Sequence, residues 1–127
     1  MTYIGGEVHI LGNTSLENID GLESVTHIGG LLDISDNQNL TSLHGLQGLL
    51  TLSGDLYIIN NASLQDLDGL QGITYIGGDC NLSHNMSLAD LHGFEYLYSI
   101  GGSLIISNNS SLQGLSHLQN LNDIIVG

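Results

Sequence analysis

The sequence predicts an all-β solenoid, in which short strands of successive coils stack side by side in parallel. Three observations predict this fold: a strict 24-residue period, apolar residues at the same seven positions of every period, and glycine and asparagine at fixed positions between them. The full units are 2–25, 26–49, 50–73, 74–97 and 98–121, and a partial unit covers 122–127. No insertion or deletion separates them, so residues 1–127 are expected to form a single solenoid domain of about five coils.

The apolar positions provide the expected core. In the first unit they are Ile4, Val8, Ile10, Leu16, Ile19, Leu22 and Val25, and residues at intervals of 24 from each of them form a column. Each buried aliphatic side chain contributes about 1.5–3 kcal/mol, so these columns are expected to stabilise the fold without disulfides. Cys80 lies in one of the columns, and we expect it to be a small buried hydrophobic residue and not a nucleophile.

Within each unit the pattern predicts one clear strand. Leu56 and Ile58 show the alternation of a half-buried strand, and turns are expected on both sides of it. A spacing of three separates the later apolar positions, which leaves a short 3₁₀ or helical turn in each coil open. Gly21 and its equivalents argue against a regular helix there.

The segment Leu-x-Ile-x-x-Asn, which runs from Leu56 to Asn61 in the third unit, resembles the core of leucine-rich repeats. The full unit, for example residues 76–97, is more similar to the receptor L-domain type, and the resemblance covers the whole chain. It implies a right-handed parallel β-helix, and a ligand-binding lobe of a cell-surface receptor as one function. It also implies an inward asparagine ladder that bonds to the backbone of the turns: Asn13, Asn37, Asn61, Asn85 and Asn109.

The charge of the chain restricts its partners. All 13 charged side chains are Asp or Glu, and there is no Lys or Arg, which gives a formal net charge of −13. Nucleic acids and anionic membranes are excluded as direct partners because both are bound through basic side chains. Cations, basic proteins, carbohydrate and further copies of the chain are compatible with this charge.

The composition also bears on location. No apolar run approaches the roughly 20 residues of a membrane helix, so we expect no membrane insertion. A chain without Lys or Arg has no sites for trypsin-like proteases, which suits a protein outside the cell or on its surface.

The two ends of the sequence carry apolar positions without polar caps. Met1 falls in the column of Val25, and Ile125 and Val126 replace the glycine pair of the interior units. Two interpretations are open: the chain is a fragment of a longer array, or copies stack head to tail into a fibre. We therefore expect a non-enzymatic extracellular repeat protein with a structural or adhesive role.

Asparagine sequons predict a glycoprotein. The sequence contains seven Asn-x-Ser/Thr motifs, at Asn13, Asn39, Asn61, Asn81, Asn85, Asn108 and Asn109. Four of them lie in the asparagine column, where the ladder is the favoured role. Asn39, Asn81 and Asn108 lie outside that column and are the better candidates for N-linked glycans.

The outward positions of the predicted strands form a candidate contact face. Its most informative members are His9, Leu31, Asp33, Tyr57, Ile59, Asn81 and Ile105. A solvated sheet is one interpretation. The exposed apolar members leave a surface that binds protein or carbohydrate open as the alternative.

The sequence contains no strong pattern for a metal site or a catalytic site. One column places Asp20, His44, Asp68, His92 and Ser116 on successive coils, which predicts a hydrogen-bonded surface ladder, with Zn²⁺ or Ca²⁺ binding a weak alternative. No cofactor and no catalytic residue is expected, because no unit breaks the repeat to gather reactive groups. Ice binding would require a uniform outward column of Thr. Thr2, Thr26 and Thr74 share their column with Leu50 and Tyr98, so ice binding is a remote alternative.

Overall fold

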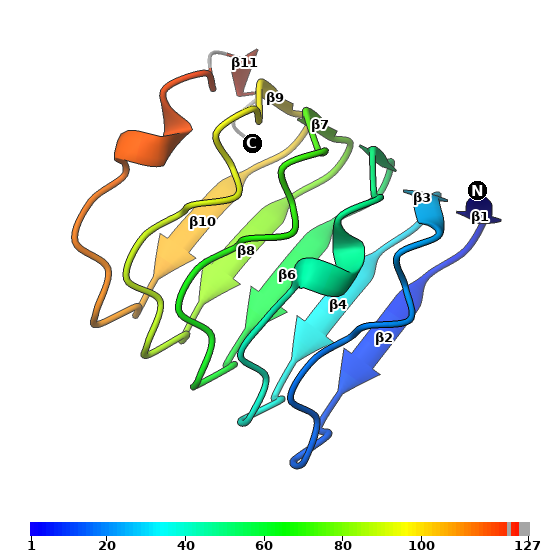
Figure 1. The fold of residues 1–127 in the computed structure, drawn as a ribbon. Coiled ribbons are helices and arrows are strands. Elements are labelled where there is room, and N and C mark those ends of the chain that lie inside the picture. Colours follow the sequence, from blue (N-terminus) through cyan, green and yellow to red (C-terminus); the bar gives the residue numbers. More distant parts are fainter. Residues whose placement is uncertain (122, 125–127) are drawn as a thin grey trace.

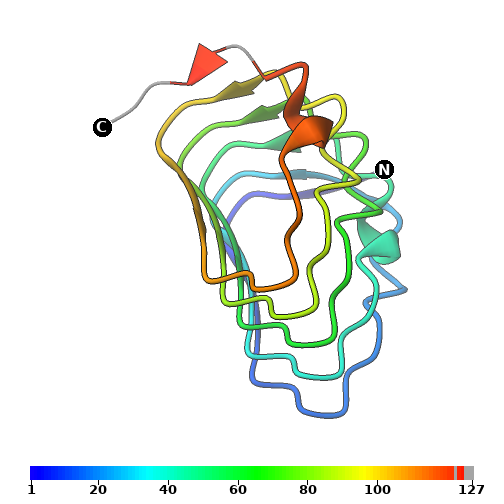
Figure 2. The same ribbon diagram turned by 90° about the vertical axis from the view of Figure 1, so that its left-hand side faces the viewer.

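The protein is an all-β parallel solenoid, as its repeat predicts (Figure 1). The computed structural model describes residues 1–121 and 123–124. Successive coils follow nearly the same outline when the stack is turned by 90° (Figure 2). The coils complete about four turns, against the five coils expected, because the first and last of five stacked strands are separated by four turns of chain.

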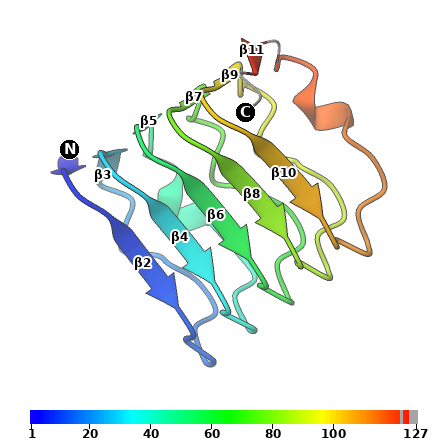
Figure 3. The same cartoon turned by 180° about the vertical axis from the view of Figure 1, so that it is seen from behind.

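Two parallel sheets form the walls of the solenoid. The five-stranded sheet contains one strand from each full unit: β2 (Val8–Leu11), β4 (Leu32–Ser35), β6 (Leu56–Ile59), β8 (Cys80–Ser83) and β10 (Leu104–Ser107). Figure 3 shows this sheet from the opposite side to Figure 1. The second sheet has six shorter strands: β1 (Thr2–Ile4), β3 (Val25–Ile28), β5 (Thr51–Leu52), β7 (Tyr75–Ile76), β9 (Ser99–Ile100) and β11 (Asp123–Ile124).

Strands pair in the register of the repeat. Leu56 lies opposite Leu32 on one side and Cys80 on the other, so each partner is 24 residues away. This register places identical columns on top of one another. The remaining end residues, including Ile125 and Val126, lie outside the described part of the chain.

The apolar columns form one continuous core. In the second, third and fourth units every residue of the seven columns is buried, including Cys80 and Phe94. Burial raises the pKa of the Cys80 thiol to about 12, so this thiol remains protonated at neutral pH. At the two ends of the stack, column members such as Val8 and Leu104 are only partly buried because one neighbouring coil is missing from their contacts.

The turn after the core leucines takes two forms. In the first, third and fourth units, Gly21, Gly69 and Gly93 have positive φ, and each backbone N–H donates to the side chain two residues later. The second and fifth units instead form 3₁₀ turns, η1 (His44–Leu46) and η2 (Ser116–Leu118). The helical turn left open by the sequence is thus present in two of the five units. Among the described residues, no helix has the length and apolar character needed to cross a membrane.

The glycine column allows the coils to approach closely. A Cβ atom at Gly93 would lie 1.9 Å from the carbonyl oxygen of Leu67 in the coil before it, and φ at Gly93 is +115°. Both facts exclude an ordinary side chain at this position unless the backbone moves.

We expect Gly93→Ala to lower the free energy of unfolding by about 2–3 kcal/mol, because it combines a steric clash with a left-handed backbone. Urea unfolding followed by circular dichroism measures the loss. Gly6→Ala is the matched control, since a Cβ there would meet nothing within 4 Å. Equal stabilities of the two variants would contradict the close approach of the coils.

Candidate functional site

A ladder of asparagine side chains joins consecutive coils. Oδ1 of Asn61 accepts the backbone N–H of Asn37 at 3.2 Å, and Nδ2 of Asn61 donates to the carbonyl oxygen of Ile34 at 2.9 Å. Each amide therefore holds the turn that follows the strand of the preceding coil. Equivalent pairs of bonds recur at Asn37, Asn85 and Asn109.

The burial of this ladder differs along the stack. Asn37, Asn61 and Asn85 are fully buried, and Asn109 is partly buried. Asn13 is exposed and has no preceding coil, and its Nδ2 donates instead to Oδ1 of Asn37 at 3.2 Å. At Asn61 and Asn85 a glycan would have to displace amide bonds inside the core.

The three sequons outside the ladder are in different surroundings. Asn39 is exposed, and its Nδ2 donates to the carbonyl oxygen of Thr14 at 2.6 Å. Asn108 is also exposed, and its Nδ2 lies 3.5 Å from Nε2 of His84. Asn81 is half-buried and accepts a hydrogen bond from the hydroxyl of Ser83, which makes it less accessible than the strand pattern suggests.

The outward face of the five-stranded sheet mixes acidic and apolar side chains. One column runs through His9, Asp33, Tyr57, Asn81 and Ile105. Asn81 separates the two apolar members of this column, and Leu31 and Ile59 lie in the columns on either side of it. Most of these side chains are half-buried by their neighbours, whereas His9 and Ile105 are exposed.

Carboxylates on this face have structural bonds. Asp55 Oδ1 accepts the backbone N–H of Asp79 at 2.7 Å, and Asp79 Oδ1 accepts the N–H of Ser103 at 2.8 Å. Partial burial and the nearby carboxylates of Asp55, Asp79 and Asp33 raise the pKa of Tyr57, so its hydroxyl stays neutral and lies 3.3 Å from Asp55 Oδ2.

The column of Asp20, His44, Asp68, His92 and Ser116 forms the expected contact between carboxylate and imidazole at one pair. Nε2 of His92 lies 3.4 Å from Oδ1 of Asp68. Asp20 and His44 form no corresponding ion pair within residues 1–121, and their backbone N–H groups donate to the side chains of Asn18 and Ser42.

A cluster that the column pattern does not predict surrounds His92. His92, Glu95 and His117 each offer one donor atom, and these atoms lie within 4.8 Å of one another. Nδ1 of His92 is 2.5 Å from Oε2 of Glu95, and the rings of His92 and His117 meet edge to face with centroids 5.8 Å apart. In the described part of the chain, Nδ1 of His117 is buried without a hydrogen-bond partner.

The cluster has a distinct electrostatic environment. Burial alone lowers the pKa of His92, but the carboxylates of Glu95, Asp68 and Asp66 outweigh it, so the pKa of His92 is raised. Burial alone raises the pKa of Glu95, but the backbone N–H groups of Glu95 and Gly93 together with His92 lower it. Each of the two side chains thus favours the charged form of the other.

The fifth unit departs from the other four at this point, contrary to the expectation that no unit breaks the repeat. His117 stands where earlier units have Gly21, Gly45, Gly69 and Gly93. Gly114 stands where Asn18, Ser42, Asp66 and Asp90 each accept the backbone N–H of the residue two positions later. Leu115 is 51% exposed, whereas its equivalent Leu91 is fully buried.

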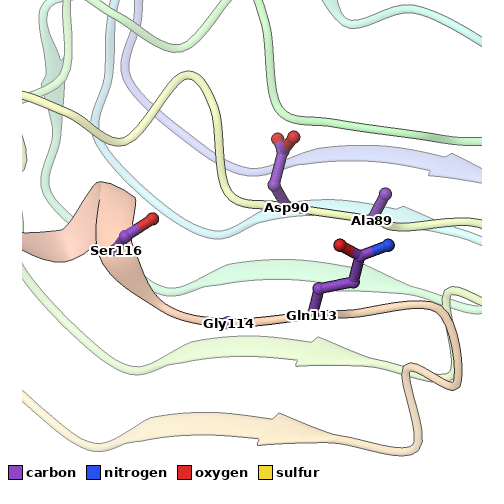
Figure 4. A pocket seen from close by; sticks show the side chains of 5 residues that line it. All are labelled: Ala89, Asp90, Gln113, Gly114 and Ser116. Carbon is purple, nitrogen blue, oxygen red and sulfur yellow. The ribbon is translucent and has the colours of Figure 1, made fainter.

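A shallow cavity lies between the fourth and fifth coils. Its volume is about 360 Å³, and it is lined by Ala89, Asp90, Gln113, Gly114 and Ser116. Figure 4 shows Ala89 and Asp90 on one coil and the other three residues on the next. Asp90 is the one acidic residue among these five.

Comparisons with family models, with curated proteins and with solved structures found no match for this chain. The β-solenoid therefore stands on the geometry of the stacked strands.

We expect Asn61→Ala to destabilise the fold by roughly 2–4 kcal/mol, because it leaves the buried N–H of Asn37 without its partner, at about 1–3 kcal/mol, and removes one hydrogen bond to the carbonyl of Ile34, at about 1 kcal/mol. Thermal and urea unfolding measure the effect. Asn39→Ala, which removes one exposed amide bond, is the control and should cost less than about 1 kcal/mol. A larger loss at Asn39 would show that the buried ladder is not what ties the coils together.

Proposed function

We propose that this chain is a non-enzymatic structural or adhesive repeat protein of the cell exterior, and that its coils join end to end with those of further copies. The observation that carries the proposal is the apolar surface at both ends of the stack. One end exposes parts of the column residues Ile4, Val8, Ile10, Leu16 and Leu22, and the other end exposes parts of Leu104, Ile106, Leu112, Leu118 and Leu121.

The two surfaces are complementary because they are opposite sides of the same repeated unit. In the interior, a coil covers these columns completely. A second copy placed one unit further along would bring its β2 beside β10, in the register that joins β8 to β10. Its Asn13 would then accept the backbone N–H of Asn109, as Asn109 accepts that of Asn85.

Open strand edges favour the same contact. β2 and β10 each have one neighbour in their sheet, so each presents backbone groups to a further strand. Because such a contact joins two different surfaces and does not close, it extends into a fibre. β11 lies where β1 of the next copy belongs, since both occupy the same position of the repeat, so stacking requires β11 to give way.

The acidic, lysine-free surface supports a location outside the cell. It has no site for trypsin-like cleavage, and 13 acidic side chains keep the sides of the rod soluble while the apolar ends remain free to associate. We also propose N-linked glycans, with Asn39 and Asn108 favoured over Asn81 because the side chain of Asn81 is half-buried and bonded.

A second candidate function follows from the resemblance to receptor L domains. The apolar side chains of Tyr57, Ile59 and Ile105 on the five-stranded sheet would be the contact surface of a ligand-binding lobe for protein or carbohydrate. In that case a monomer would be the functional form, and the ends of the stack would play no part in binding.

Leu115→Glu is expected to weaken association at least tenfold without loss of secondary structure, because it puts a charge on the apolar end surface. Analytical ultracentrifugation over a range of concentrations measures the assembly. Leu50→Glu is the control, because Leu50 and Leu115 are both 51% exposed but Leu50 lies on the side of the stack.

A chain that stops at Leu121 contains whole units only and should associate more strongly than the full chain. A strictly monomeric protein in both lengths would overturn the end-to-end proposal and favour the receptor lobe.

Secretion of the protein from a eukaryotic host tests the glycans. Peptide mass spectrometry should find modified Asn39 and Asn108, with Asn61 and Asn85 unmodified because their amides are buried. Treatment with a glycosidase that converts linked Asn to Asp gives the occupancy of each site. Unmodified Asn39 and Asn108 would remove the glycoprotein proposal.

A further inference from the structure

We propose that His92, Glu95 and His117 bind one Zn²⁺ ion that ties the fifth coil to the fourth. The donors come from two successive units, so a single ion would cross-link neighbouring turns of the solenoid. None of these residues belongs to the five-stranded sheet.

The donor atoms are close enough to meet on an ion. Zn²⁺ binds imidazole nitrogen and carboxylate oxygen at about 2.0–2.2 Å, so tetrahedral ligands stand roughly 3.3 Å apart. The donors of His92, Glu95 and His117 already lie within 4.8 Å of one another. His92 is exposed, so rotation of its side chain can shorten the remaining distances. Asp68 lies 3.4 Å from Nε2 of His92, the ring nitrogen that does not face Glu95, and is not a donor to this ion.

The unpartnered nitrogen of His117 points to a missing ligand. Nδ1 of this ring is buried and has no hydrogen-bond partner, which is a costly state for a polar atom. One nitrogen of this ring lies within 4.8 Å of donor atoms of His92 and Glu95, which are residue types that bind metals. In the proposed site a bound cation would give the ring a partner and would offset the negative charge of Glu95.

Glu95 is held in place for such a role. Its Oε1 accepts the backbone N–H of Gly93 at 2.6 Å, which leaves Oε2 directed at the His92 ring. An outer hydrogen bond of this kind orients a metal ligand and fixes its charge.

The other units provide an internal comparison, because none of them has the same set of donors. In the second unit His44 is the equivalent of His92, but Gln47 replaces Glu95 and Gly69 replaces His117. In the third unit Gln71 and Gly93 occupy these positions. The cluster therefore arises only where the fifth unit gives up its glycine.

The residue types favour Zn²⁺ over Ca²⁺. Imidazole nitrogens suit zinc and other late transition metals, whereas Ca²⁺ takes oxygen ligands. The chain has no Lys or Arg to compete for the carboxylates, and its net charge of −13 attracts cations. Binding is expected to weaken on acidification, because protons compete for both histidines.

The test is isothermal titration of the full chain with Zn²⁺ after treatment with a chelator, at a pH above neutrality. One ion per chain is expected, and Co²⁺ in its place should give the intense visible absorption of a tetrahedral site. His117→Gly restores the residue found in the other four units, so this variant should fold. Its affinity for Zn²⁺ should fall at least tenfold.

Glu95→Gln is a second variant that keeps the fold, because Gln71 already accepts the N–H of Gly69 in the third unit. It should also bind Zn²⁺ at least tenfold more weakly. His44→Ala, which removes the equivalent of His92 in the second unit, is the control and should bind like the unmodified chain. Absence of stoichiometric binding would overturn the proposal, and so would an equal loss of affinity in His44→Ala, since that would indicate diffuse attraction to an acidic surface.

Discussion

In-register stacking of equivalent residues is the constraint on which every other feature of this protein depends. A coil can bond to the next only if both have the same path, because each donor and acceptor is matched to a residue 24 positions away. The asparagine ladder enforces that match inside the core. Asn61 bonds both to the carbonyl of Ile34 and to the N–H of Asn37. Both bonds can form only if the turn of the preceding coil has this backbone conformation and this register. The polar ladder thereby selects one register among the many that a purely apolar core would accept.

The same constraint explains why a substitution at one position can create a local site. Gly93 lies against the carbonyl of Leu67, and the corresponding position of the next coil holds His117. The second coil, which keeps Gly45, forms the same kind of 3₁₀ turn as the fifth, so the turn does not depend on His117. His117 adds an imidazole within reach of His92 and Glu95 on the coil before it. A side chain in an otherwise glycine column therefore changes the surface chemistry between two coils.

The period was sufficient to predict the solenoid, the apolar core and the burial of Cys80, because a repeat with fixed spacing brings each residue next to its own equivalents. The inward asparagine ladder was expected from the resemblance to leucine-rich repeats, and its bonds join each amide to residues 24 and 27 positions earlier. The His92 cluster could not be predicted in this way. Its members lie in three different columns, and comparison within columns hides contacts that run diagonally from one coil to the next. The one sign of the cluster in the sequence is His117, which stands where the other four units have glycine. A consensus of the five units shows glycine at this position and so omits the histidine.

The accessibility of Asn81 shows a second limit of the pattern. Alternation along a strand correctly separates inward from outward positions, but it does not report how far the side chains of adjacent coils cover one another. Strands about 4.8 Å apart leave an outward residue partly enclosed by the residues above and below it. Asn81 is accordingly half-buried and bonded to Ser83, and Tyr57 is half-buried among carboxylates. Outward side chains of a stacked sheet are therefore less exposed to solvent than those of a single strand.

Contacts that reach only from one coil to the next also determine how such a molecule responds to mechanical load. Pulling on the ends of the chain would peel a coil from the stack while the rest stays intact, since a coil in the interior has two neighbours and a terminal coil has one. Each event would release one 24-residue unit, which corresponds to about 80 Å of extended chain. Under load, the chain would therefore lengthen in equal steps, and the folded rod would lose one whole turn at each step.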